Sequence, residues 1–203
     1  MVLAMSKKSA FKIICNNSFY SYGVEVLVKH ILKEYPFCLM EKVINDLIIP
    51  DIIIITENLM IDLVPFVNSL EKDKQYIVFC SSRVRRVLEN IPGVNVVCFV
   101  RIEASCTEAE RAIRETLFKY MSKTNHADMK INTSPSHLLT ATQKEVVDLM
   151  ANGLHPRQIS KIYDMNIKKV SLLKRNAMTR LGVSTNQELI VKSLVLRETE
   201  SAE

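Results

Sequence analysis

The chain has 203 residues, of which 48% are hydrophobic and 24% are charged. This balance is typical of a globular protein with a core and argues against a disordered chain. The net charge of +5 is unevenly placed, because residues 135–197 hold ten Lys and Arg against four Asp and Glu. A basic C-terminal part indicates a polyanionic partner, although excess positive charge also serves solubility.

The five cysteines are odd in number and show no CxxC spacing, so we expect reduced thiols and no metal site. No apolar stretch approaches the ~18 residues that a membrane span needs. Lysines interrupt the N-terminus, so no signal-peptide pattern is present. We therefore expect a cytoplasmic protein with no membrane partner.

The first two thirds of the chain alternate between short apolar runs and helical periodicity. We predict strands at 11–15, 37–43, 51–56, 75–80 and 94–100, and helices at 18–35, 83–90 and 107–122, with a poor helix candidate at 61–70. Such alternation predicts a parallel sheet covered on both faces. The expected fold class is α/β, with a flavodoxin-like doubly wound N-terminal domain.

The carboxyl ends of parallel strands usually carry the chemistry of such a domain. Here they are followed by Asn16 and Asn17, by Thr56 and Glu57, by Ser81 and Ser82, and by Arg101. The chain has four glycines and no glycine-rich phosphate loop. No nucleophile–base pair, paired acid or metal cluster stands out, so we expect neither an enzyme nor a cofactor.

The succession of elements resembles that of a response-regulator receiver domain. The resemblance implies an acidic pair after the first strand, a phospho-accepting aspartate after the third and a lysine after the fifth. This chain has Asn16 and Asn17, Thr56, and Arg101 at those positions. Two amides and a hydroxyl do not supply the anionic oxygens that Mg²⁺ requires. We therefore expect a degenerate receiver that is not phosphorylated on an aspartate by the usual route.

Residues 123–137 are polar and lack apolar periodicity, which is typical of a linker. The expected domains are residues 1–122, a linker at 123–137, and a C-terminal module at 138–203. The first helix of that module begins with a capping box, Thr140 and Gln143, and stops at Gly153. Pro156 opens a second helix at 157–165, whose inward residues would be Ile159, Ile162 and Tyr163.

A tight turn at 164–166 leads into a third helix, 167–181, which has two different faces. We expect Asn166 to be its N-cap and Gly182 its C-terminal glycine. One face is apolar and should pack inward: Ile167, Val170, Leu173, Ala177 and Leu181. The other is polar and basic: Lys168, Ser171, Leu172, Arg175 and Thr179. Taken alone, this second face is either a solvated surface or a face that enters a DNA major groove.

A second capping box, Ser184 and Gln187, predicts a fourth helix. Four short helices with a tight turn between the second and third predict an all-α helix-turn-helix module. Within residues 139–194 a set of residues stands at a familiar, ungapped spacing: Leu139, Thr140, Glu145, Val146, Leu149, Ala151, Gly153, Leu154, Ile159, Val170, Asn176, Met178, Leu181, Gly182, Val183, Glu188 and Leu189. In these positions the segment resembles the LuxR/GerE-type DNA-binding domain. The departures are Gln143, Ser160, Lys169 and Leu173, and none removes the scaffold.

The resemblance implies that Ser171, Leu172 and Arg175 read DNA bases, which is the same face that the helical projection places outward. Arg175 suits the O6 and N7 atoms of guanine, and Leu172 suits a thymine methyl group. The basic side chains expected on phosphates are Arg157, Lys161, Lys168, Lys169 and Lys174. Lys174 is the weakest of these, since it lies nearest the core side.

The last helix is the usual dimer surface of this family, which implies Leu189, Ile190 and Leu194 as dimer contacts. The alternative is that this helix simply packs on the first helix of its own module. The sequence thus predicts a bacterial transcription regulator that binds double-stranded DNA as a homodimer or as a heterodimer with another response regulator. A second reading is an auxiliary protein that acts mainly by binding another response regulator. The absence of Trp and the strand rhythm argue against a ligand-sensing regulator of the quorum-sensing type.

Overall fold

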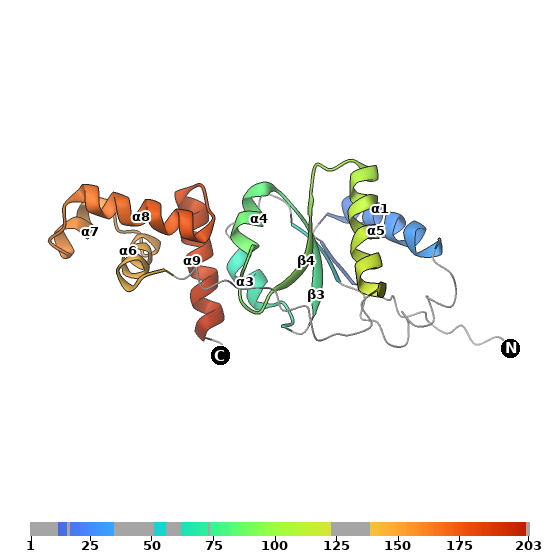
Figure 1. Cartoon of the computed structure of the whole chain (residues 1–203), viewed down its shortest axis with the longest axis horizontal. Helices are drawn as coiled ribbons and strands as arrows, with labels where there is room; N and C mark the ends of the chain where they lie inside the picture. The colour runs from blue at the N-terminus through green and yellow to red at the C-terminus, as the bar shows by residue number, and fades with distance from the viewer. Residues whose placement is uncertain are drawn as a thin grey trace. The chain divides into compact units, whose positions relative to one another are not determined.

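The computed structural model describes residues 12–15, 17–34, 51–55, 62–72, 74–122 and 139–201, which form two compact units (Figure 1). The sheet unit contains β1 (Ile13–Cys15), β2 (Asp51–Ile54), β3 (Gln75–Cys80) and β4 (Asn95–Arg101), with α1 (Ser18–Lys33) and α5 (Cys106–Ser122). The helical unit contains α3 (Leu63–Asn68), α4 (Ser82–Leu88), α6 (Ala141–Ala151), α7 (Pro156–Ile162), α8 (Ile167–Leu181) and α9 (Asn186–Ser201). None of the helices in these ranges is long and apolar enough to cross a membrane.

The four described strands are parallel and lie in the order β1-β2-β3-β4. Their positions agree with the predicted strands at 11–15, 51–56, 75–80 and 94–100 to within two residues where they are described. The predicted strand at 37–43 lies outside the described residues. The predicted flavodoxin-like α/β fold is confirmed: the described strands are parallel in one sheet, and α3 and α4 lie in the connections that follow β2 and β3.

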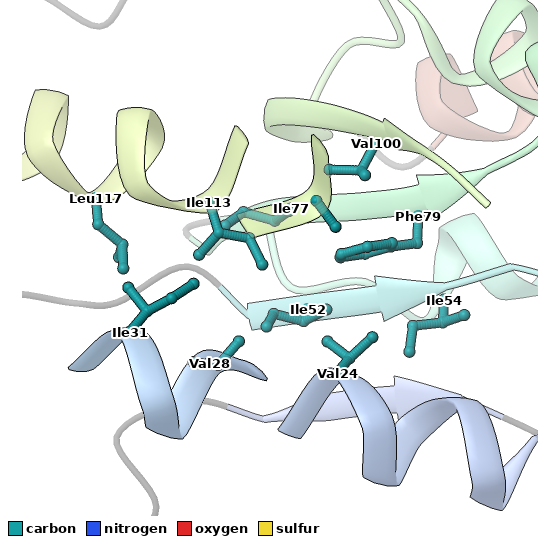
Figure 2. Packing of buried hydrophobic residues seen from close by; sticks show 11 residues of the cluster. Val24, Val28, Ile31, Ile52, Ile54, Ile77, Phe79, Val100, Ile113 and Leu117 are labelled. Carbon is teal, nitrogen blue, oxygen red and sulfur yellow. The ribbon is translucent and has the colours of Figure 1, made fainter. Parts of the chain in front are cut away.

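One face of the sheet packs against α1 and α5. Side chains from the two helices and from β2, β3 and β4 point into a single layer (Figure 2). Its buried members are Val24, Val28, Ile31, Ile52, Ile54, Ile77, Phe79, Val100, Ala109, Ile113 and Leu117. The alternate residues Ile53, Ile55, Tyr76 and Val78 are also buried. The strands β2 and β3 are therefore buried on both faces, which explains why they appear in the sequence as continuous apolar runs.

Three predicted details need correction. The segment at 61–70, a poor helix candidate because of Pro65, does form α3, since Pro65 is its third residue and the missing N–H would have no partner there. The second helix of the module ends at Ile162 and not at residue 165. Ile162 was predicted to point inward, but it lies at the helix end and is 60% exposed.

The start of α9 lies one residue later than predicted. The Oγ1 atom of Thr185 accepts from the amide of Glu188 at 3.1 Å, and a carboxylate oxygen of Glu188 accepts from the amide of Thr185 at 3.3 Å. This reciprocal pair is a capping box. The predicted partner Gln187 instead accepts a hydrogen bond from Arg83 at 3.0 Å.

Candidate nucleic-acid interface

Helix α8 is closed at both ends by its own sequence. The side-chain oxygen of Asn166 accepts from the amide of Lys168 at 2.8 Å, which caps the first turn. At the other end Gly182 has φ 66°, and its N–H reaches the carbonyls of Met178 and Thr179. A left-handed residue after the last turn is favourable for glycine. The predicted helix at 167–181 and both predicted caps are confirmed.

The inward face of α8 packs into two apolar clusters. Val170 joins α6 and α7 through Val146, Met150 and Ile159, with Leu173 packed at the edge. Ala177 and Leu181 join a second cluster with Val147, Val183 and Leu189. Ile167 belongs to neither cluster and is 40% exposed, so the prediction that it packs inward is wrong.

Helices α6 and α7 pack against α8, and each of them has an N-cap. The predicted capping box of α6 is present, since Thr140 and Gln143 exchange backbone-to-side-chain hydrogen bonds at 3.0 and 3.3 Å. Helix α7 begins with Pro156, and His155 caps it through Nδ1, which accepts from the amide of Arg157 at 3.3 Å. These caps fix where α6 and α7 begin.

The outward face of α8 is basic and carries one large apolar side chain. Lys168, Arg175 and Thr179 are exposed, and Ser171 is half-buried. Leu172 is 54% exposed, although contact with water is unfavourable for a leucine side chain. The side chain of Arg175 lies over its own helix, with Nε 3.5 Å from the carbonyl of Ser171. The structure thus brings the three predicted base-reading residues to one open face.

Five basic side chains lie on or beside this face: Arg157, Lys161, Lys168, Lys169 and Lys174. Lys174 is half-buried and the other four are exposed. Within residues 139–201 none of the five makes an ion pair with a carboxylate. Glu145 is one nearby carboxylate, and it is engaged by the hydroxyl of Tyr163, whose pKa that hydrogen bond raises. The face therefore offers positive charge that the described module does not neutralise.

The three residues of α9 that were predicted as dimer contacts differ in their burial. Leu189 is fully buried in the module's own apolar cluster, while Ile190 and Leu194 are half-buried. Leu189 therefore serves the core, and the expected dimer surface is reduced to Ile190 and Leu194. Two charged residues of α9, Glu188 and Lys192, are buried and were missed by sequence reasoning. The local sequence of α9 gives no signal for this burial, because partners of both residues come from α4.

At the strand ends that correspond to the receiver positions, the described residues Asn17 and Arg101 make structural contacts. Asn17 caps α1, because its side-chain oxygen accepts from the amide of Tyr20 at 3.0 Å. Arg101 lies at the end of β4 and pairs with Glu108 at 3.5 Å. Asn16 and Thr56 lie outside the described residues. Among the residues that are described, no group of three acidic, His or Cys side chains could hold a metal ion.

The helix-turn-helix part of the chain matches a known protein family. The family of bacterial regulatory proteins called the luxR family matches residues 137–193. Residues 137–193 form a luxR-family helix-turn-helix domain. This luxR domain is the DNA-binding domain of bacterial transcription regulators, and it contains α6, α7, α8 and the first half of α9.

Two relatives extend the comparison beyond the luxR domain. The oxygen regulatory protein NreC of Staphylococcus aureus is 23% identical over 109 residues, which are 53% of this chain and 50% of that protein. The chain thus spans about half the length of the curated relatives that it matches. The structure of the two-component response regulator RcsB in complex with DNA covers 95% of this chain and 98% of its own, with a TM-score of 0.59 and 18% identity. At 18% identity this similarity supports only the fold, both of the sheet unit and of the helical unit.

Proposed function

We propose that this chain is a sequence-specific transcription regulator that inserts α8 into the major groove of double-stranded DNA. The observation that carries the proposal is the outward face of α8, where Ser171, Leu172 and Arg175 lie together on a capped and rigidly packed helix. A rigid helix that offers both donors and an apolar side chain suits the base edges of the major groove. The solved RcsB structure of similar fold contains DNA, which supports this proposal.

Each of the three residues has a distinct chemical role. The guanidinium of Arg175 donates two parallel hydrogen bonds to the O6 and N7 atoms of a guanine. The hydroxyl of Ser171 donates to or accepts from a base edge. Leu172 removes its exposed side chain from water by contact with a thymine methyl group, which explains its position on an open face.

The surrounding cations position the domain without reading sequence. Arg157 and Lys161 of α7 and Lys168 and Lys169 of α8 contact the phosphates on either side of the groove, and Lys174 contributes least. These contacts release counterions, so affinity falls steeply as the salt concentration rises.

The regulator acts as a dimer and does not depend on aspartyl phosphorylation. One helix-turn-helix reads too few base pairs to be specific, and Ile190 and Leu194 supply a partly open apolar surface on α9. The partner is a second copy or another response regulator. Asn17 and Arg101 occupy positions where a receiver needs a carboxylate and a lysine, which supports independence from phosphorylation. The alternative is an auxiliary protein that acts mainly through another regulator.

The test replaces Arg175 and compares specific with random DNA. We expect Arg175→Ala to lower affinity for the cognate site by about 1–3 kcal/mol and to relax selection at one base position. The matched control is Lys161→Ala, which should weaken binding to all sequences and reduce the slope of log K against log salt by about 1.

Sites selected from a random duplex library, followed by fluorescence anisotropy, measure both effects. Equal loss on cognate and random DNA in the Arg175 variant would remove its base-reading role. Binding by the wild-type chain that shows no salt dependence would favour the auxiliary function.

A further inference from the structure

Two buried charges on α9 have no part in the DNA-reading face. The side chains of Glu188 and Lys192 are one helical turn apart, and their residues are 0% and 4% exposed. A buried charge is unfavourable unless it is paired and hydrogen-bonded. Both charges find their partners on α4 and at the corner where α8 meets α9, and all of these segments belong to the helical unit.

Glu188 joins α4 to the start of α9. Arg86 donates to its carboxylate through Nη2 at 2.8 Å and through Nε at 3.1 Å, which is a two-point contact. The same carboxylate accepts from the amides of Ser184 and Thr185 at 2.8 and 3.3 Å. Arg83 approaches it at 3.6 Å. One side chain therefore caps α9 and holds α4 at the same time.

Lys192 joins the same α4 to the end of the recognition helix. Its ammonium donates to the carbonyls of Arg86, Glu89 and Leu181 at 2.7, 2.8 and 2.8 Å. An ammonium has three N–H donors, so these acceptors satisfy it completely. Two of the acceptors lie at the end of α4, and the third is the last residue of α8. Burial lowers the pKa of Lys192 to about 8, and the Glu89 carboxylate opposes that shift.

The shared ammonium makes α4 and α8 interdependent. If α4 moved away, Lys192 would keep only one carbonyl acceptor while still buried, which is an unfavourable arrangement. The ammonium would then turn toward water and release the carbonyl of Leu181 as well. Loss of Arg86 would likewise remove the two-point contact and leave the buried Glu188 carboxylate with only the more distant Arg83, at 3.6 Å. A change in α4 must therefore reach the C-terminal end of α8.

We propose that α4 acts as a positioning element for the recognition helix, with Arg86, Glu188 and Lys192 as a clamp on the corner between α8 and α9. Leu172 and Arg175 are exposed and Ser171 is half-buried while the clamp is closed, so the clamp orders α8 and does not block it. A signal that displaces α4 loosens this corner and lowers affinity for DNA. The effect on DNA rests on the proposed function, whereas the effect on the corner does not.

The test uses the full chain with Arg86→Ala, and Arg85→Ala as its matched control. Arg85 lies on the same helix and pairs with Glu89, a residue of its own segment, at 3.5 Å. In Arg86→Ala we expect hydrogen exchange at the amides of Ser184 and Thr185 to become about tenfold faster. Affinity for DNA should fall about tenfold with an unchanged salt slope, because no phosphate contact is lost. Arg85→Ala should leave the exchange at both amides unchanged.

Two further variants keep the outcome decisive. Arg86→Lys retains the charge without the two-point contact, so it should fall between the wild type and Arg86→Ala even if the alanine variant folds poorly. Glu188→Gln retains an acceptor for the cap, and combining it with Arg86→Ala should have less than the sum of the two single effects.

Unchanged exchange at Ser184 and Thr185 in both Arg86 variants would overturn the clamp. A salt slope reduced by about 1 in Arg86→Ala would assign Arg86 to a phosphate and overturn its positioning role. If the wild-type chain binds no DNA, the proposed function fails, and the exchange experiment still decides whether the clamp exists.

Discussion

Adjacent residues of α8 have opposite roles because a helix turns by about 100° per residue. Leu173 packs at the edge of an apolar cluster, whereas its neighbour Leu172 is 54% exposed. Helical position does not by itself predict the burial of Glu188 and Lys192. These charged residues are buried because α4 supplies partners for them. Their burial depends on Arg86 and on backbone carbonyls that are about 100 residues distant in sequence.

The stability of the helical unit should depend on the ionisation of Glu188. Burial by itself raises the pKa of this carboxyl, but the hydrogen bonds from Arg86 and from the amides of Ser184 and Thr185 outweigh it and hold the pKa at about 2. The ordinary value is 4.5. The folded state therefore binds fewer protons than the unfolded state between these values, so this contribution is present above pH 4.5 and is lost as the pH falls toward 2.

We expect the wild type to lose up to roughly 3 kcal/mol more than Glu188→Gln when urea unfolding is compared at pH 7 and pH 2.5. Circular dichroism measures the transition. Other carboxylates titrate in both proteins, so their contribution cancels in the comparison. Equal acid sensitivity of the two proteins would show that Glu188 is not held ionised.

At the scale of single elements, local sequence accounts for where the helices of the luxR domain begin and end. The caps at Asn166, Thr140 and Gly182 all lie where the sequence predicts them. The two misplaced boundaries, the end of α7 and the start of α9, have different causes. Helix α7 ends early because the chain reverses at Asp164, which has φ 46°. At α9 Glu188 replaces Gln187 because its carboxylate also serves Arg86.

Gly182 and Gly23 allow the effect of backbone conformation on stability to be measured apart from the effect of packing. A Cβ atom at Gly182 or at Gly23 would meet no atom within 4 Å, so neither position is crowded. Gly182 has φ 66°, whereas Gly23 lies inside α1. We expect Gly182→Ala to destabilise the fold by about 1 kcal/mol and Gly23→Ala to stabilise it by about 0.5–1 kcal/mol. Urea unfolding of the two variants measures both effects, and a neutral Gly182→Ala would contradict the strain.

At the scale of the whole molecule, the proposed regulator should assemble through α9 without phosphorylation. Sedimentation velocity of the full chain should give a dimer, and Ile190→Glu should shift it to a monomer because a charge would enter an apolar contact. Ser193→Glu is not a suitable control, since Ser193 is buried. Asn152→Glu is suitable, because Asn152 is exposed at the end of α6 and does not belong to α9, so it should leave the dimer unchanged.

Incubation with a small phosphodonor and Mg²⁺ should change neither the sedimentation of the wild type nor its intact mass. A stable phosphoryl adduct on an acidic side chain would contradict independence from phosphorylation. A wild-type monomer that becomes a dimer only with another response regulator would support the heterodimer over the homodimer.

The sequence by itself determined the alternation of strands and helices, the helix-turn-helix and its open basic face. These follow from local periodicity, from caps and from side-chain type, which act over a few residues. Only the tertiary structure decided that Leu189 belongs to the core, that Ile162 and Ile167 are exposed, and that Glu188 and Lys192 are buried with α4. Burial depends on what another element brings to that position, and such long-range partners leave no periodic trace in the sequence.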